Sequence, residues 1–256
     1  MSAPDLSGAM VWLTRPIAQA EAWRAAFEAA GACVLVEPLL VINPPDDELT
    51  AATALDDAEA ADIVIATSAN AISGAARLRP HWAPRGMLLA VGEATAEALR
   101  TYTGRSVDTP EHADTEGLLA MPALGRVAGR RVALLAGHGG RAALADALIA
   151  RSAQLDRIAL YRRVPAPIDS ARLDRLLMAD AVVVTSVEAW RHLVALAKDA
   201  KRARLADLRL VAASHRVVQQ AGCDVDHWAV EPVVIERMDA AGAVAALDRI
   251  WPVRGQ

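Results

Sequence analysis

Asp62-Ile-Val-Ile-Ala-Thr-Ser68 is echoed at an offset of 118 residues by Asp180-Ala-Val-Val-Val-Thr-Ser186, so a short apolar run between Asp and Thr-Ser occurs twice in the chain. Short runs rich in Val and Ile, bounded by turn residues, are typical of strands buried on both faces of a parallel sheet. Each run leads into a segment of helical length. The pair therefore predicts an α/β fold with an internal repeat.

Two further pairs of segments extend this similarity in the same order. Leu88-Leu-Ala-Val-Gly92 resembles Arg209-Leu-Val-Ala-Ala-Ser214, and Val11-Trp-Leu-Thr-Arg15 resembles Val132-Ala-Leu-Leu-Ala136. Ala-rich α/β stretches also resemble one another by chance. Three ordered matches at nearly one offset favour a true duplication.

The expected strands share this short, apolar composition, and most are followed by a turn residue and a helical segment. They are Met10–Thr14, Cys33–Val36, Ile63–Thr67, Met87–Val91, Arg131–Leu135, Ile158–Leu160, Ala181–Thr185, Leu208–Ala212 and Val225–Val230.

Two proline-bearing segments, within residues 37–45 and 161–167, interrupt the alternation. Because proline is excluded from central strands, both are expected to be extended connectors at which the chain passes between domains. The sequence thus predicts two similar parallel-sheet, flavodoxin-like domains, with a ligand site in the cleft between them. Residues 1–37 plus 168–256 would form a discontinuous domain and residues 46–160 an inserted one, with connectors at 38–45 and 161–167.

The charge and composition favour a small-molecule ligand over nucleic acid. The 256 residues carry a formal net charge of −4, so there is no excess of cations to neutralise phosphates, and with one Phe and two Tyr the chain is poorly supplied with stacking platforms. No stretch approaches the roughly 20 apolar residues of a membrane helix, and the N-terminus shows no signal-peptide pattern, so a cytoplasmic location is expected. Cys33 and Cys223 are expected to be buried, inert thiols.

Common catalytic and cofactor motifs are absent from the sequence. We find no phosphate-binding loop, no G-x-G-x-x-G after the first strand, no G-x-S-x-G and no H-E-x-x-H. The six histidines have no metal-ligand spacing relative to one another, and two cysteines cannot complete a zinc set. No metal and no organic cofactor are therefore expected.

Small polar groups recur instead at the carboxyl ends of the expected strands, where helices begin. One explanation for these residues is structural, because Ser, Thr and Gly are common caps at the starts of helices. The other is ligand binding, because open parallel sheets bind ligands at this edge and free helix N–H groups suit carboxylates or phosphates.

Two further features, a glycine-rich loop and a tyrosine beside the second connector, each allow a structural or a functional interpretation. Gly137-His-Gly-Gly-Arg141 suits either an anion cradle or a simple strand-to-helix turn. Tyr161 stands at a strand end beside Arg162 and Arg163, where its hydroxyl either faces the cleft or belongs to a half-buried connector.

Taken together, these groups resemble uroporphyrinogen-III synthases over nearly the whole chain, from about Val11 to Ile250. The landmarks are Leu13-Thr-Arg-Pro16, Thr67-Ser-Ala-Asn-Ala71, Val91-Gly92 with Thr95-Ala96, Gly139-Gly-Arg141, Leu160-Tyr-Arg-Arg163, Thr185-Ser186 and Ser214-His-Arg216. Their order and spacing carry the resemblance, since no single motif is specific.

The resemblance implies a hydro-lyase that cyclises hydroxymethylbilane to uroporphyrinogen III with loss of water and inversion of the last pyrrole ring. Loss of the hydroxyl gives an azafulvene, the last ring attacks it, and a spiro intermediate fragments and recloses. Because the free substrate closes to the uninverted isomer, much of this catalysis is conformational. Tyr161 corresponds to the family tyrosine proposed as general acid for departure of the hydroxyl.

The resemblance also implies how the acetate and propionate groups of the substrate are held, through backbone N–H groups and hydroxyls. The substrate-binding residues expected on this basis are Thr14, Arg15, Ser68, Gly92, Thr95, Arg141, Ser186, Ser214 and Arg216. The chain departs from the family at Ala66, where an aromatic is common, at Ala136, where an Arg often stands, and at Val217, which replaces a Thr.

The main alternative is a non-enzymatic two-domain sensor or binding protein for an anionic small molecule. Tyr161 and the strand-end hydroxyls favour the enzyme, and we expect no additional signalling module. A nucleotide- or sugar-binding enzyme fits less well, because a phosphate loop is missing. We expect a monomer that contacts no nucleic acid or membrane and takes its substrate by transient handover from the preceding pathway enzyme.

Overall fold

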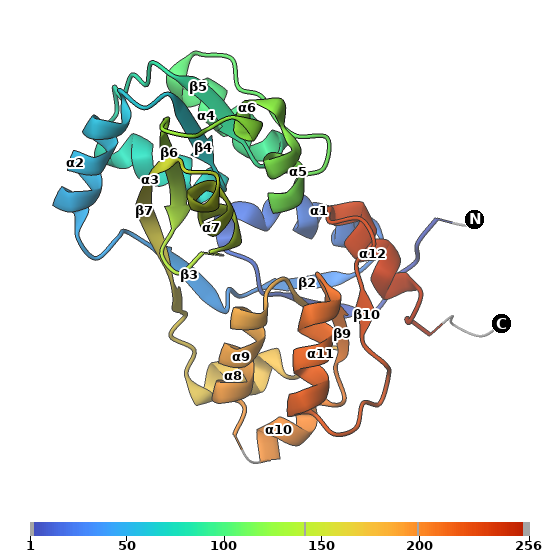
Figure 1. Cartoon of the computed structure of the whole chain (residues 1–256). Helices are drawn as coiled ribbons and strands as arrows, with labels where there is room; N and C mark the ends of the chain where they lie inside the picture. The colour runs from blue at the N-terminus through green and yellow to red at the C-terminus, as the bar shows by residue number, and fades with distance from the viewer. Residues whose placement is uncertain (1–2, 141, 199, 253–256) are drawn as a thin grey trace. The chain divides into compact units, whose positions relative to one another are not determined.

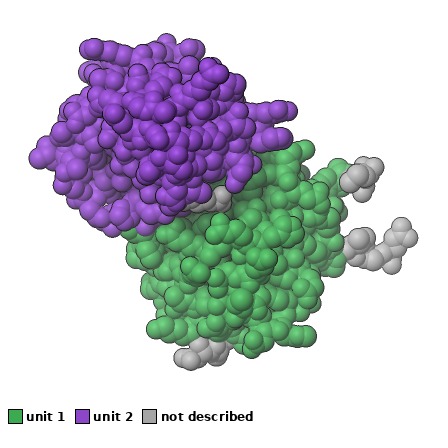
Figure 2. All heavy atoms as spheres, in the orientation of Figure 1, with its two compact units in different colours: residues 1–41, 164–256 green, residues 42–163 purple. Residues whose placement is uncertain are grey.

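The computed structural model describes residues 3–140, 142–198 and 200–252. They form two compact units, one of residues 1–41 and 164–256 and the other of residues 42–163 (Figure 2). The first unit is thus built from both ends of the chain and the second from its middle. The chain leaves the first unit within β3 (Leu40–Asn43) and returns within β7 (Gln154–Pro165).

Each unit contains a five-stranded sheet. The order is β10-β9-β8-β1-β2 in the first unit and β3-β7-β6-β4-β5 in the second, and the strands for which a register is defined pair in parallel (Figure 1). When the second order is reversed, β5-β4-β6-β7 corresponds to β9-β8-β1-β2. Three of these four correspondences, β5 with β9, β4 with β8 and β6 with β1, are the ones that the repeat in the sequence relates, and the predicted fold class is confirmed.

The first unit has a helical layer on each face of its sheet. Its elements are β1 (Met10–Leu13), the 3₁₀ turn η1 (Ile17–Gln19), α1 (Glu21–Ala29), β2 (Cys33–Val36), α8 (Ser170–Leu176), β8 (Ala181–Val184), α9 (Val187–Leu196), α10 (Ala200–Leu205), β9 (Arg209–Ala212), α11 (His215–Asp224), β10 (Val233–Val234) and α12 (Ala240–Asp248). Successive strand residues point to opposite faces. Trp12 accordingly packs with α8, α9 and α11, whereas Val11 and Leu13 pack with α1 and α12.

The second unit repeats this arrangement. Besides β3 and β7 it contains α2 (Glu48–Ala58), β4 (Ile63–Ala66), α3 (Ala69–Leu78), β5 (Met87–Ala90), α4 (Glu93–Thr103), α5 (Thr115–Ala120), α6 (Pro122–Gly125), β6 (Arg131–Gly137) and α7 (Ala143–Ala150). Val64 faces the core shared with α2, α3 and α4, and its neighbours Ile63 and Ile65 face the core shared with α5, α6 and α7. Continuous apolar runs are therefore needed in both sheets.

The structure corrects one expected strand and lengthens another. Residues 225–230 are not a strand, because Trp228 anchors them by packing on Trp190 with ring centroids 5.9 Å apart. The pairing with β9 is made farther along, by Val233 and Val234. The strand expected at Ile158–Leu160 is only the middle of β7, which spans Gln154–Pro165.

The two cysteines are exposed, which corrects the expectation that they are buried. Cys33 is the first residue of β2, and β2 lies at the edge of its sheet, where no further strand covers it. Cys223 lies in the last turn of α11. Residue type alone therefore did not report the exposure of either thiol.

Candidate functional site

The predicted site residues follow strands at the carboxyl edges of the two sheets. Ser68 follows β4 and begins α3, and Gly92 follows β5 and begins α4. In the other unit Ser186 follows β8 and begins α9, and Ser214 follows β9 and begins α11. Since the paired strands are parallel, each sheet gathers its set along one edge.

The contacts of Tyr161 are the most specific in this set. Its side chain is 4% exposed, on β7. The Ser68 hydroxyl donates to the phenolic oxygen over 3.2 Å, and Nη2 of Arg163 donates to the same oxygen, also over 3.2 Å. Ser68 in turn accepts a bond from the Ala71 amide over 3.2 Å, which leaves its own proton for the phenol. The structure thus joins two predicted residues, Ser68 and Tyr161, and adds Arg163.

The phenol ring of Tyr161 rests against Gly137, which lies beside it on β6. A Cβ at position 137 would stand 2.6 Å from Cζ of the ring and 2.9 Å from Cε1 and Cε2. The Gly137–Tyr161 pairing follows a shift of register between β6 and β7. Glycine is therefore required at 137 for close packing of the ring, an explanation that neither interpretation of the loop at residues 137–141 included.

Sequence reasoning missed Arg163 and Gly137 as site residues. The signal for Arg163 was its spacing, because residues i and i+2 of a strand share a face. Gly137 could not be identified in this way, since its role depends on the register of another strand.

In the first unit, the Thr14 hydroxyl is engaged by the sheet itself. Thr14 is 3% exposed, and its Oγ1 donates to the Val183 carbonyl over 2.7 Å. This bond links the end of β1 to β8. The structure therefore gives Thr14 a structural contact and does not display its hydroxyl for a ligand.

Arg15 is placed differently, with a half-buried guanidinium whose Nε has no hydrogen-bond partner within the described part of the chain. Its Cζ lies 4.4 Å from the centroid of the Trp23 ring, a cation–π contact. Burial lowers the pKa of the Arg15 guanidinium from its usual value. A buried cation with an unsatisfied donor favours an anionic ligand.

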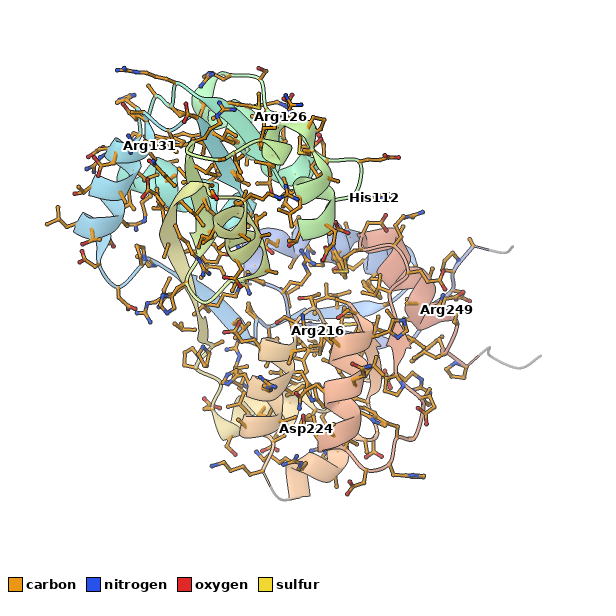
Figure 3. The ribbon with its side chains drawn as sticks, viewed as in Figure 1. His112, Arg126, Arg131, Arg216, Asp224 and Arg249 are labelled. Carbon is orange, nitrogen blue, oxygen red and sulfur yellow. The ribbon has the colours of Figure 1, made fainter. Side chains whose placement is uncertain are left out.

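Ser186, Ser214 and Arg216 also lie at helix starts in the first unit. Ser186 accepts a capping bond from the Ala189 amide over 3.1 Å, as Ser68 does from its own helix. Ser214 makes no such bond. Arg216 is an exposed residue in the first turn of α11, and Figure 3 shows it at the end of the helix opposite Asp224.

Gly92, Thr95 and Arg141 complete the predicted set. A Cβ on Gly92 would stand 2.9 Å from that of Ala113, so this helix start lies under the segment before α5. Thr95 is 6% exposed in the first turn of α4. Arg141 lies outside the described residues. The adjoining loop is bound instead by Arg157, whose Nη2 donates to the Gly140 carbonyl over 2.8 Å.

The caps of these helices differ in charge from those of four other helices in the chain. The helices that directly follow β4, β5, β8 and β9 begin at Ser68, Gly92, Ser186 and Ser214, which are all neutral. Four other helices begin at aspartates, namely Asp47, Asp114, Asp169 and Asp239. A capping carboxylate neutralises the positive helix end, whereas a hydroxyl or glycine leaves it for an anion. The neutral caps thus suit a substrate bearing carboxylates best at α3 and α11, because α4 and α9 carry an acidic residue in their first turns, Glu93 and Glu188.

Neither a metal cluster nor a membrane helix is found in the described ranges. In residues 3–140, 142–198 and 200–252, no three His, Cys, Asp or Glu side chains lie close enough together to hold a metal ion. Among the same residues, no helix has both the length and the apolar character needed to cross a membrane.

Comparison with known proteins identifies one family. The family described as Uroporphyrinogen-III synthase HemD matches residues 21–234. The chain is 29% identical over 220 residues to uroporphyrinogen-III synthase of Escherichia coli K12, covering 82% of this chain and 89% of that protein. It is 31% identical over 166 residues to the enzyme of Salmonella typhimurium LT2, covering 63% and 68% of the two chains.

Solved structures show the same fold. A variant uroporphyrinogen III synthase of the extreme thermophile Thermus thermophilus superposes with a TM-score of 0.60 at 20% identity, over 94% of this chain and 98% of that one. Uroporphyrinogen-III synthetase of Helicobacter pylori 26695 also gives a TM-score of 0.60, at 11% identity, over 93% and 96% of the two chains.

Proposed function

The chain belongs to the uroporphyrinogen-III synthase family, and from this premise we propose how its own residues act in the reaction. The protein is an enzyme that cyclises hydroxymethylbilane to uroporphyrinogen III, with loss of water and inversion of the last pyrrole ring. We assign the first chemical step to Tyr161 and the binding of the substrate carboxylates to the neutral helix starts.

The observation that carries this assignment is the buried phenol of Tyr161 with two donors on its oxygen, Ser68 and Arg163. The oxygen of a phenol has two acceptor sites and one proton. With both acceptor sites used, the proton is left to donate outward. That is the arrangement a general acid requires.

In the proposed step, the C–O bond of the hydroxymethyl group breaks and the Tyr161 proton passes to the departing oxygen, which leaves as water. The electron pair of the pyrrole nitrogen forms the azafulvene as its N-protonated cation, whose positive charge balances the negative charge left on the phenol. The negative charge left on the phenol oxygen is stabilised by the bonds from Ser68 and Arg163. When the closed macrocycle later regains aromaticity it releases one proton, which restores the phenol.

The carboxylates of the substrate are proposed to bind at the helix starts that carry no acidic cap. Ser186, Ser214 and the amides of α4 supply neutral donors, and Arg15 and Arg216 supply cations. Thr95, buried in the first turn of α4, is retained as a substrate-binding residue. Thr14 contributes indirectly by fixing the strand end before Arg15. Ring inversion then depends on holding one conformation of a flexible substrate.

The test is to supply freshly made hydroxymethylbilane and to separate the oxidised uroporphyrin isomers. The type III fraction is expected to rise well above that of a protein-free control. Tyr161→Phe is expected to lower turnover by about a hundredfold, the lower end of the range for loss of a general acid, because an activated pyrrole expels water readily. A phenylalanine variant that works at the full rate would remove Tyr161 from the mechanism.

We further propose that the enzyme acts as a cytoplasmic monomer and receives its substrate by transient handover from the enzyme that produces it. The handover is supported by the chemistry of hydroxymethylbilane, which closes spontaneously to the wrong isomer when left free. Analytical sedimentation, which gives the molecular mass in solution, tests whether the enzyme is a monomer. Isomer ratios measured with an added trap for free substrate test the handover.

A further inference from the structure

The side chains of β7 after Leu160 divide between the two faces of the strand. Tyr161 and Arg163 share one face because they are two residues apart, whereas Arg162 points the other way. Arg162 is paired there with Asp46, its Nε lying 2.9 Å from a carboxylate oxygen. The two neighbouring arginines therefore differ in what they contact.

Arg163 contacts Tyr161 in two ways. Nη2 donates to the phenol oxygen over 3.2 Å, and Cζ of the guanidinium lies 5.9 Å from the centroid of the ring. The phenol is thereby held from the side of its oxygen by Arg163 and Ser68 and from the side of its ring by Gly137. Since a Tyr ring swings about two torsions, these contacts fix where its proton points.

We infer that Arg163 is a positioning residue for the reaction: it occupies one acceptor site of the Tyr161 oxygen, so that the phenol proton is directed to the substrate. This inference rests on the proposed role of Tyr161. Arg163 acts through the phenol and does not itself transfer a proton. Its cationic end also stabilises the negative charge that appears on the oxygen during the step.

The experiment compares Arg163→Met with Arg162→Met as the matched control, because the control removes the same charge one residue away on the opposite face. Arg163→Met is expected to lower kcat about fivefold, the size of one lost hydrogen bond, with KM unchanged within about twofold. Arg162→Met is expected to keep the wild-type kcat. Arg163→Lys, which restores a donor and a charge, is expected to recover part of the lost rate.

A double-mutant cycle with Tyr161→Phe separates positioning from direct substrate binding. If Arg163 acts through the phenol, Arg163→Met has no further effect on kcat in the Tyr161→Phe background. The same loss in both backgrounds, or a rise in KM, would overturn the inference. So would an Arg163→Met enzyme with the wild-type kcat. If Arg163→Met does not fold, Arg163→Ala, which also removes the donor and the charge, is carried through the same cycle and decides in the same way.

The type III fraction formed by the wild-type protein shows whether a negative result contradicts the proposed function or only the role of Arg163. A wild-type protein that fails to raise the type III fraction would overturn the proposed function and the inference together. A wild-type protein that raises it, with an Arg163 effect independent of Tyr161, would overturn the inference alone.

Discussion

Gly137→Ala tests the packing of Tyr161 most directly. The new Cβ would stand 2.6 Å from Cζ of the Tyr161 ring, whereas non-bonded carbons settle at about 3.5 to 4.0 Å. The ring must therefore move by about 1 Å. It is buried at 4% exposure, so it has little open space to enter, and we expect a cost of about 1 to 3 kcal/mol in the free energy of unfolding.

We expect the same displacement of the ring to lower the reaction rate strongly even in protein that remains folded. The bond from Ser68 to the phenol already measures 3.2 Å, so a shift of about 1 Å breaks it. Misplacement of a reacting group by about 1 Å can lower the rate about a hundredfold. The assay is the initial rate of type III uroporphyrinogen formation, alongside thermal unfolding.

Gly125→Ala is the matched control, because nothing lies within 4 Å of its added Cβ. It should leave rate and unfolding temperature nearly unchanged. A Gly137→Ala enzyme with wild-type rate and stability would refute the reasoning that the missing Cβ positions the phenol.

Three further predictions follow from contacts of single residues. Ser186→Ala should cost about 1 kcal/mol of folding stability, because it removes the capping bond to the Ala189 amide. Ser214→Ala removes no capping bond, so it should raise KM without lowering the unfolding temperature, and equal unfolding temperatures for the two variants would contradict this. Thr14→Val should destabilise the protein by about 1 to 3 kcal/mol, since it leaves the buried Val183 carbonyl without its hydroxyl donor, and unchanged chemical denaturation would refute that role. The Arg79 guanidinium holds the pKa of Asp56 below its usual value, so this stabilisation is present above the unfolded pKa of about 3.9 and is lost as the pH falls through the folded pKa. Because the pair lies at the surface, the difference in unfolding temperature between wild type and Asp56→Asn should be small at neutral pH and disappear in acid; a difference that persists in acid would contradict this.

Much of the fold follows from local patterns in the sequence. The runs after Asp62 and Asp180 are continuous in Val, Ile and Ala because each strand is covered by helices on both faces, and this burial is visible as composition. The repeat likewise related strands that occupy corresponding places in the two sheet orders. The Ser and Gly helix starts were identifiable because capping needs particular residue types at strand ends.

The expected strand at residues 225–230 shows where such patterns fail. Val225 and Trp228 are apolar because they pack against the core, not because they pair with a neighbouring strand. Composition reports burial but does not distinguish a packed loop from a strand. The strand of Val233 and Val234 was missed for the opposite reason, since two residues are too few to show a period.

Residue types and their local order are enough to show that the chain is a duplicated α/β protein and to identify the strand ends that carry hydroxyls, glycines and arginines. Only the tertiary structure decided that Thr14 is bound by its own sheet, that Ser68 and Arg163 converge on Tyr161, and that Gly137 makes room for its ring. Each of these contacts depends on which strands are neighbours and in what register, and that is set by the packing of residues far apart in the chain.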